Sequence, residues 1–226
     1  MKKGSISTRN FCLLSGVSGV IGVSMIILSF MINSGPPSGA STAQLEIFGL
    51  ENFHQILLGA WLQAVGPVFI VLFAFAIVKI AGATGKLAGW MTFFGSNILM
   101  TVSLIEITFY IGVLFQQPEV NVPIIMNLIN AVQHLYFIVA APAFFVPLGI
   151  VIISSPILPH IFGYLAILLG LVFATIGLAT LFKLVLPPSI LILGSLQGLW
   201  WLSASVNFLL RANNFQSVLN QKTLSN

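Results

Sequence analysis

The chain has 226 residues, of which 58% are hydrophobic and only 5% are charged, and aspartate does not occur in it. A soluble protein of this length needs a polar shell that this composition cannot supply, so the sequence indicates a polytopic membrane protein. The net charge of +4 comes from basic residues at the ends of apolar runs rather than from a basic helix face, which argues against nucleic-acid binding.

Six apolar stretches are each long enough to cross a bilayer, which takes about 20 residues of helix. Barrel strands are excluded, because they run for about 10 residues and alternate polar with apolar side chains. We therefore predict an all-α, single-domain membrane helix bundle over residues 1–226, with spans at roughly 11–32, 53–80, 89–115, 123–153, 160–182 and 188–210. The first stretch is longer than the apolar region of a signal peptide, so we expect an uncleaved helix.

The distribution of lysine and arginine predicts the orientation, because cytoplasmic loops carry the excess of both. With the N-terminus inside, the cytoplasmic segments hold Lys2, Lys3, Arg9, Lys79, Lys86, Arg211 and Lys222, against Lys183 alone on the opposite side. We therefore expect both termini in the cytoplasm, an external loop at 33–52 and a cytoplasmic tail at 211–226. Three of the four acids, Glu46, Glu51 and Glu119, then fall on the outer side.

Glu106 is the only acidic residue well inside a predicted span, where a charged side chain is costly. It shares its depth with three other polar side chains, since Gln63, His134 and Gln197 also lie about ten residues from the outer ends of their spans, or roughly 15 Å at the rise of an α-helix. Four helices therefore place polar groups at one level of the bundle.

Helical spacing extends this layer toward the outside, because residues three, four or seven apart share a helix face. We predict an outward-facing polar pocket that contains Glu106, His134, Gln63, Gln197, Tyr110, Asn130, Asn127 and Gln133. The alternative is purely structural, since polar side chains between membrane helices also hold those helices together, at about 0.6 kcal/mol each. If Glu106 and His134 touch, they form either an ion pair or a neutral hydrogen-bonded pair, and the sequence leaves both open.

Glycine and proline within the spans indicate close packing and local distortion. Gly163, Gly170 and Gly177 form a seven-residue stripe on the fifth span, and small residues of this kind let helix backbones approach closely. Pro67, Pro142 and Pro147 lie inside spans, where each frees a backbone carbonyl or kinks the helix.

The sequence lacks the zinc, nucleotide and nucleophile motifs of common enzyme classes. The three histidines, His54, His134 and His160, fall at three different depths, so no two of them are placed to hold a haem. We predict no metal site and no cofactor.

Several short motifs carry a resemblance to a known family. They are Ser103-Leu104-Ile105-Glu106, Gln133-His134-Leu135, residues 142–149 (PAFFVPLG), residues 158–164 (LPHIFGY) and residues 196–200 (LQGLW). With these motifs, the chain resembles a family of six-helix bacterial integral membrane proteins that is catalogued only as a domain of unknown function. The resemblance implies the bacterial cytoplasmic (inner) membrane and no particular activity.

Three functions fit these observations. The first is a small-molecule binder or transporter with the polar pocket around Glu106 and His134, for which a homodimer would supply the second half of a transporter. The second is an intramembrane enzyme on a lipid or isoprenoid-like substrate, with the same two residues as acid and base. The third is a non-catalytic membrane subunit or sensor. The expected partners are membrane lipids and a small-molecule ligand, and an opening between helices toward the lipid favours the enzyme over the binder.

Overall fold

The structure is a computed structural model that describes residues 8–33, 39–115, 122–182, 184 and 188–212. These residues form helices and turns, without any β-strand, which confirms the all-α prediction. The elements are α1 (Thr8–Ile32), α2 (Thr42–Glu51), α3 (Phe53–Ile80), α4 (Leu87–Phe115), α5 (Val122–Leu135), the π-helical turn η1 (Tyr136–Ala140), α6 (Ala141–Ile153), α7 (His160–Leu181) and α8 (Pro188–Leu210).

Five segments of the described chain are long and apolar enough to cross a membrane, at 9–32, 53–80, 87–112, 124–153 and 160–181. The fourth comprises α5, η1 and α6 in sequence, so one predicted span consists of two α-helices joined by a π-turn. Helix α8 is not among the five. The structure therefore shows a helical bundle with five candidate membrane spans, and the sixth span remains a prediction.

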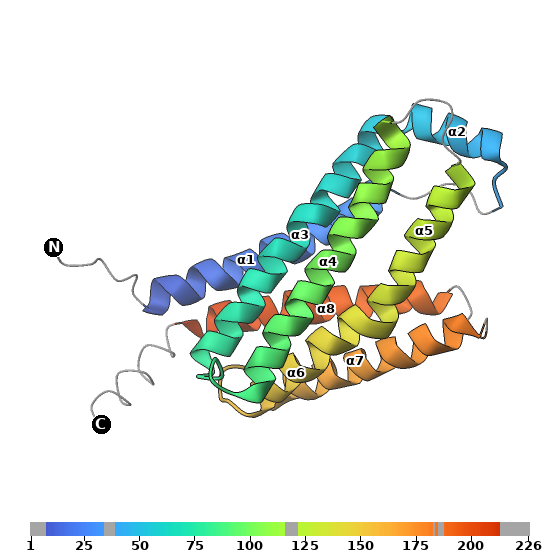
Figure 1. The fold of residues 1–226 in the computed structure, drawn as a ribbon. Coiled ribbons are helices and arrows are strands. Elements are labelled where there is room, and N and C mark those ends of the chain that lie inside the picture. The colour runs from blue at the N-terminus through green and yellow to red at the C-terminus, as the bar shows by residue number, and fades with distance from the viewer. Residues whose placement is uncertain (1–7, 34–38, 116–121, 183, 185–187, 213–226) are drawn as a thin grey trace, which may run out of the picture.

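Helix α2 corrects the prediction of a loop at 33–52. Ser41 caps this helix, because its hydroxyl accepts from the backbone of Gln44 at 3.4 Å while the Gln44 side chain accepts from the backbone N–H of Ser41 at 2.8 Å. This reciprocal capping box satisfies two otherwise unpaired N–H groups and starts a helix. Ten residues are too short to cross a bilayer, and Figure 1 shows α2 lying across one end of the bundle. We call this the α2 end, and the end with the α3–α4 turn the opposite end.

The long helices pack in a ring (Figure 1). Helix α1 packs on α3, α3 on α4, α4 on α5 and α6, α6 on α7, and α8 contacts both α7 and α1. The contact between α7 and α8 is the least extensive of these. Gly194 of α8 has no neighbouring atom within 4 Å of its Cβ position, so this face of α8 is open.

Glycines allow the closest approaches between helices. A Cβ on Gly149 of α6 would lie 2.6 Å from the carbonyl oxygen of Gly163 of α7, and a Cβ on Gly163 would lie 2.7 Å from the oxygen of Gly149. Gly170 and Gly177 also face α6 and η1 closely. The predicted glycine stripe of the fifth span is therefore the face of α7 that packs on the preceding span.

Aromatic side chains fill the half of the bundle away from α2. Their rings lie in edge-to-face or tilted pairs at 5.3–6.1 Å, a favoured geometry. Members of this aromatic core are Phe73 of α3, Phe144 and Phe145 of α6, and Trp201 and Phe208 of α8, and all are almost completely buried. This core closes the centre of the bundle on that side.

Candidate functional site

Glu106 of α4 is buried, with 7% of its surface exposed, between two glutamine side chains from two other helices. Gln63 of α3 donates from Nε2 to the Oε2 atom of Glu106 at 3.0 Å, and Gln133 of α5 donates from Nε2 to Oε1 at 2.8 Å. Each carboxylate oxygen thus has one amide donor. The structure brings three of the eight predicted pocket residues into one hydrogen-bonded cluster, which we call the Glu106 cluster.

Ser103 replaces a backbone hydrogen bond of Gln63 that Pro67 removes from α3. Proline has no N–H, so Pro67 cannot donate to the carbonyl oxygen of Gln63, four residues earlier in α3. The hydroxyl of Ser103 in α4 donates to that oxygen instead, at 3.1 Å. Ser103 lies three residues before Glu106 on the same face of α4, so one turn of α4 binds both the backbone and the side chain of Gln63.

The charge of Glu106 has no protein counterpart among the described residues. None of the described lysines, arginines or histidines forms an ion pair with it, and its hydrogen-bond donors are neutral amides. An ionised carboxylate only accepts hydrogen bonds, which suits the two amide donors. A protonated Glu106 would donate from its hydroxyl group, and either glutamine could accept by turning its amide over. The cluster can therefore hold both protonation states with a change of one side-chain amide.

The other predicted pocket residues lie apart from these bonds. Gln197 of α8 accepts from the hydroxyl of Tyr136 at 2.7 Å, and the Nδ1 atom of His134 lies 3.3 Å from the hydroxyl oxygen of Thr180 in α7. Asn127 and Asn130 are exposed on α5, and Tyr110 is partly buried one turn beyond Glu106. On α5, the donor to Glu106 is thus Gln133, while the neighbouring His134 contacts α7.

Two residues of this region were not predicted, Tyr136 and Thr180. Tyr136 follows Gln133 by three residues, and buried Ile129 lies four residues before Gln133, so these three share a face of the fourth span. The sequence spacing alone suggested the alternative face with Asn127, Asn130 and His134. Burial of Ile129 and Val132 shows which side of α5 faces the bundle, and the sequence contains these two β-branched residues four positions and one position before Gln133.

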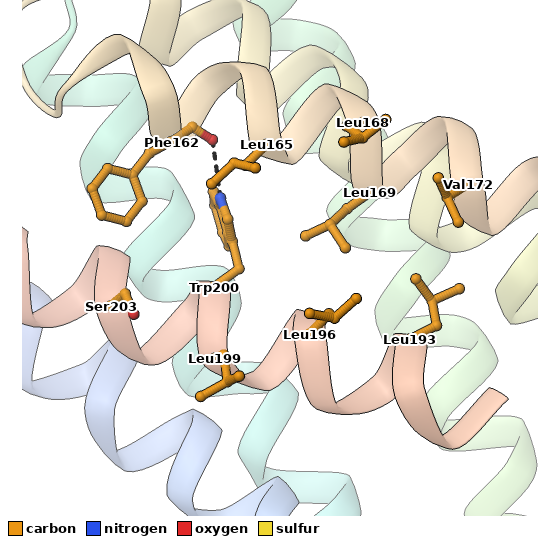
Figure 2. A pocket seen from close by; sticks show the side chains of 10 residues that line it. All are labelled: Phe162, Leu165, Leu168, Leu169, Val172, Leu193, Leu196, Leu199, Trp200 and Ser203. Atoms are coloured by element: carbon orange, nitrogen blue, oxygen red, sulfur yellow. Dashed lines mark hydrogen bonds between the residues drawn. The ribbon is translucent and has the colours of Figure 1, made fainter. Parts of the chain in front are cut away.

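An apolar groove of about 320 Å³ lies between α7 and α8 (Figure 2). Side chains of Leu165, Leu168 and Leu169 face those of Leu193, Leu196 and Trp200 across it. The indole N–H of Trp200 donates to the carbonyl oxygen of Phe162 at 2.9 Å, so this polar group is already satisfied.

Comparison with known proteins gives no relative: no family model, no curated protein and no solved structure matches this chain. The geometry of the site therefore carries the functional argument.

Proposed function

We propose that this chain is a six-span integral membrane protein that binds a small molecule at the Glu106 cluster and exchanges a proton there, as a binder or transporter. The observation that supports this most directly is the burial of Glu106 between two neutral amides. A charged residue at the centre of a membrane helix costs about 2.5–3.5 kcal/mol on insertion scales.

An acid at this position is unnecessary for packing alone. A glutamine offers both a donor and an acceptor, so three glutamines could connect the same three helices without a charge. The acid adds the ability to bind and release a proton, or to attract a cationic group of a ligand. Intramembrane acids of this kind are typical of proton and substrate pathways.

An approach to the site from the opposite end is closed, because the aromatic core fills that half. Gln63 and Phe73 are ten residues apart on α3, which corresponds to roughly 15 Å along the helix.

The α2 end faces the outside in this proposal, in the cytoplasmic membrane of a bacterium. Arg9, Lys79, Lys86 and Arg211 belong to helix ends or turns at the opposite end, whereas Glu46 and Glu51 belong to α2 (Figure 1). This separation supports a cytoplasmic opposite end. Lys2, Lys3, Lys183, Lys222 and Glu119 lie outside the described residues.

The groove between α7 and α8 lies between exposed leucines, which is the opening expected for the enzyme, but the positions of Glu106 and His134 favour binding over acid–base catalysis by these two residues. A general acid and base need to reach the same reacting group within hydrogen-bond distance. Here Glu106 is bonded to α3 and α5, while His134 contacts Thr180 of α7. The two side chains have different partners on different helices, which suits separate roles.

Infrared spectroscopy of the purified protein in lipid nanodiscs tests the proposal. The C=O stretch of a protonated carboxylic acid in an apolar site absorbs apart from carboxylate and amide bands. A band that disappears as pH rises, and that is absent from Glu106→Gln, supports proton exchange at Glu106. Glu51→Gln is the matched control, because Glu51 is an exposed acid on α2, and it should keep the band. A wild-type difference spectrum that contains no pH-dependent contribution from Glu106 contradicts the proposal.

A further inference from the structure

The groove between α7 and α8 opens on the surface that the bundle presents to a membrane. Leu168 of α7 and Leu196 of α8 line it and are both exposed. Helix α7 is a candidate membrane span, so its exposed leucines face hydrocarbon. Apolar cavities do not hold water, because water needs polar partners. The chemistry of the lining therefore selects a hydrocarbon chain as the occupant.

A polar residue of α8 lies between two of the positions that line the groove. Leu193, Gln197 and Trp200 share a face of α8, and the first and last of these line the groove. Gln197 instead reaches across to the hydroxyl of Tyr136 at 2.7 Å. The ring of Phe173, from α7, lies edge-on to that of Tyr136, with centroids 5.6 Å apart.

Tyr136 also lies next to the Glu106 cluster. It follows Gln133 by three residues, and Gln133 donates directly to Glu106. Two hydrogen bonds on neighbouring turns of one segment thus connect α8 to Tyr136 and α4 to Gln133. A chain of contacts therefore leads from the α8 wall of the groove through Gln197 and Tyr136 to the segment that carries Gln133 and binds Glu106.

The backbone at this point is irregular. Tyr136–Ala140 is a π-turn in which the N–H of Ala141 donates to the oxygen of Tyr136, and Pro142 follows without an N–H. Such π-turns occur frequently at functional sites. The contact between α7 and α8 is also the least extensive around the ring. The bond between Tyr136 and Gln197 joins η1 to α8 directly.

We infer that the ligand of the Glu106 cluster is an amphipathic molecule that enters from the hydrocarbon between α7 and α8. Its apolar tail lies in the groove, and its polar group reaches Glu106 when the hydrogen bond between Tyr136 and Gln197 opens. This inference rests on the proposed function and names the class of molecule that the site takes.

Dicyclohexylcarbodiimide is a suitable probe, because it is apolar and reacts with protonated carboxylic acids. The acid proton moves to one carbodiimide nitrogen and the carboxylate oxygen bonds to the central carbon. The resulting O-acylisourea rearranges to a stable N-acylurea, which peptide mass spectrometry locates. We expect modification of Glu106 in nanodiscs, with a rate that reports access from the lipid.

Three variants separate the lipid route from other routes. Leu168→Phe/Leu196→Phe fills the groove from exposed positions and should slow the labelling of Glu106. Leu178→Phe/Leu210→Phe changes two exposed leucines of the same helices outside the groove, and should leave the rate unchanged. Tyr136→Phe removes the hydrogen bond and keeps the ring, so it should raise the rate by about threefold, the factor that an average interhelical hydrogen bond contributes.

The outcomes distinguish this inference from the proposed function. Labelling of Glu106 at the same rate in the groove-filled protein and in its control overturns the lipid route and leaves proton exchange standing. If Glu106 shows a pH-dependent infrared band but never reacts with dicyclohexylcarbodiimide, even in Tyr136→Phe, the lipid route is likewise overturned and proton exchange stands. Absence of both the band and the labelling contradicts the proposed function itself.

Tryptophan fluorescence tests the occupant of the groove independently of Glu106. In a Trp61→Phe/Trp90→Phe background, only the buried Trp200 and Trp201 remain. Phosphatidylcholine with brominated acyl chains should quench this fluorescence, since a chain in the groove touches Trp200. Adding Leu168→Phe/Leu196→Phe should reduce the quenching and adding Leu178→Phe/Leu210→Phe should not. Equal quenching in the two proteins would show that no chain occupies the groove.

Discussion

The hydroxyl of Ser103 donates to the backbone carbonyl oxygen of Gln63 at 3.1 Å, at the position where Pro67 leaves α3 without a helical donor. A second proline has a similar effect in α6. Pro147 cannot donate to the carbonyl oxygen of Ala143, and this oxygen lies against Gly95 of α4. Helix α4 therefore meets two carbonyl groups that prolines have freed, one on α3 and one on α6.

The contact between Ser103 and Gln63 predicts a coupled pair of substitutions. Ser103→Ala should lower the free energy of unfolding by about 1–2 kcal/mol, because it leaves the Gln63 carbonyl unsatisfied in the bundle. In a Pro67→Ala background the backbone N–H of residue 67 can donate to the Gln63 carbonyl oxygen, so Ser103→Ala should lower the free energy of unfolding by much less. Unfolding of the four proteins in mixed micelles measures the coupling.

Ser96→Ala is the matched control for this cycle. Ser96 is another serine of α4 and is buried, and its hydroxyl donates to the carbonyl oxygen of Thr92 in its own helix at 2.7 Å. Ser96→Ala should therefore lower the free energy of unfolding by the same amount with and without Pro67. Additive effects of Ser103→Ala and Pro67→Ala would show that the hydroxyl does not replace the missing N–H.

Gly95→Ala should destabilise the bundle, because its Cβ would lie 2.1 Å from the carbonyl oxygen of Ala143. Overpacking of this kind costs about 1–3 kcal/mol. Gly112→Ala on the same helix has no atom within 4 Å and should be neutral or stabilising, since alanine favours the helix. Thermal unfolding compares the two, and equal stability of both variants would mean that α4 and α6 are farther apart than the structure shows.

Glu106→Gln and Glu106→Leu should differ in stability. Glutamine at position 106 can still accept from at least one of the two amides, so we expect the free energy of unfolding to change by no more than about 1 kcal/mol. Leucine leaves both Gln63 and Gln133 without their partner, at about 1–3 kcal/mol for each buried amide. Unfolding in mixed micelles measures both, and a leucine variant as stable as the glutamine variant would place the amides in contact with water.

Cysteine accessibility tests the orientation and the sixth span. In a Cys12→Ala background, a cysteine at Ser41 or Leu184 should react with an impermeant maleimide from outside intact cells. A cysteine at Thr84 or Ser225 should react only after permeabilisation, because seven of eight basic residues are predicted on that side. Reaction at Leu184 and Ser225 from the same side would show that α8 does not cross the membrane.

The composition and apolar run lengths by themselves determined the class of this protein and the position of its long helices. They also singled out Glu106, because an acid inside an apolar run is rare enough to be informative. The position of Gln63 beside Glu106 followed from depth alone. Helices α3 and α4 are antiparallel neighbours, and ten residues from the outer end of each reach the same level.

Only the tertiary structure decided which neighbours of Glu106 reach it. Gln133 and His134 are adjacent in sequence, and about 100° of helix rotation separates their directions, so depth does not distinguish them. The packing of Ile129 and Val132 turns Gln133 toward α4 and His134 toward Thr180. The groove between α7 and α8 depends in the same way on how loosely two helices meet, because side-chain spacing along one helix does not specify its distance from the next.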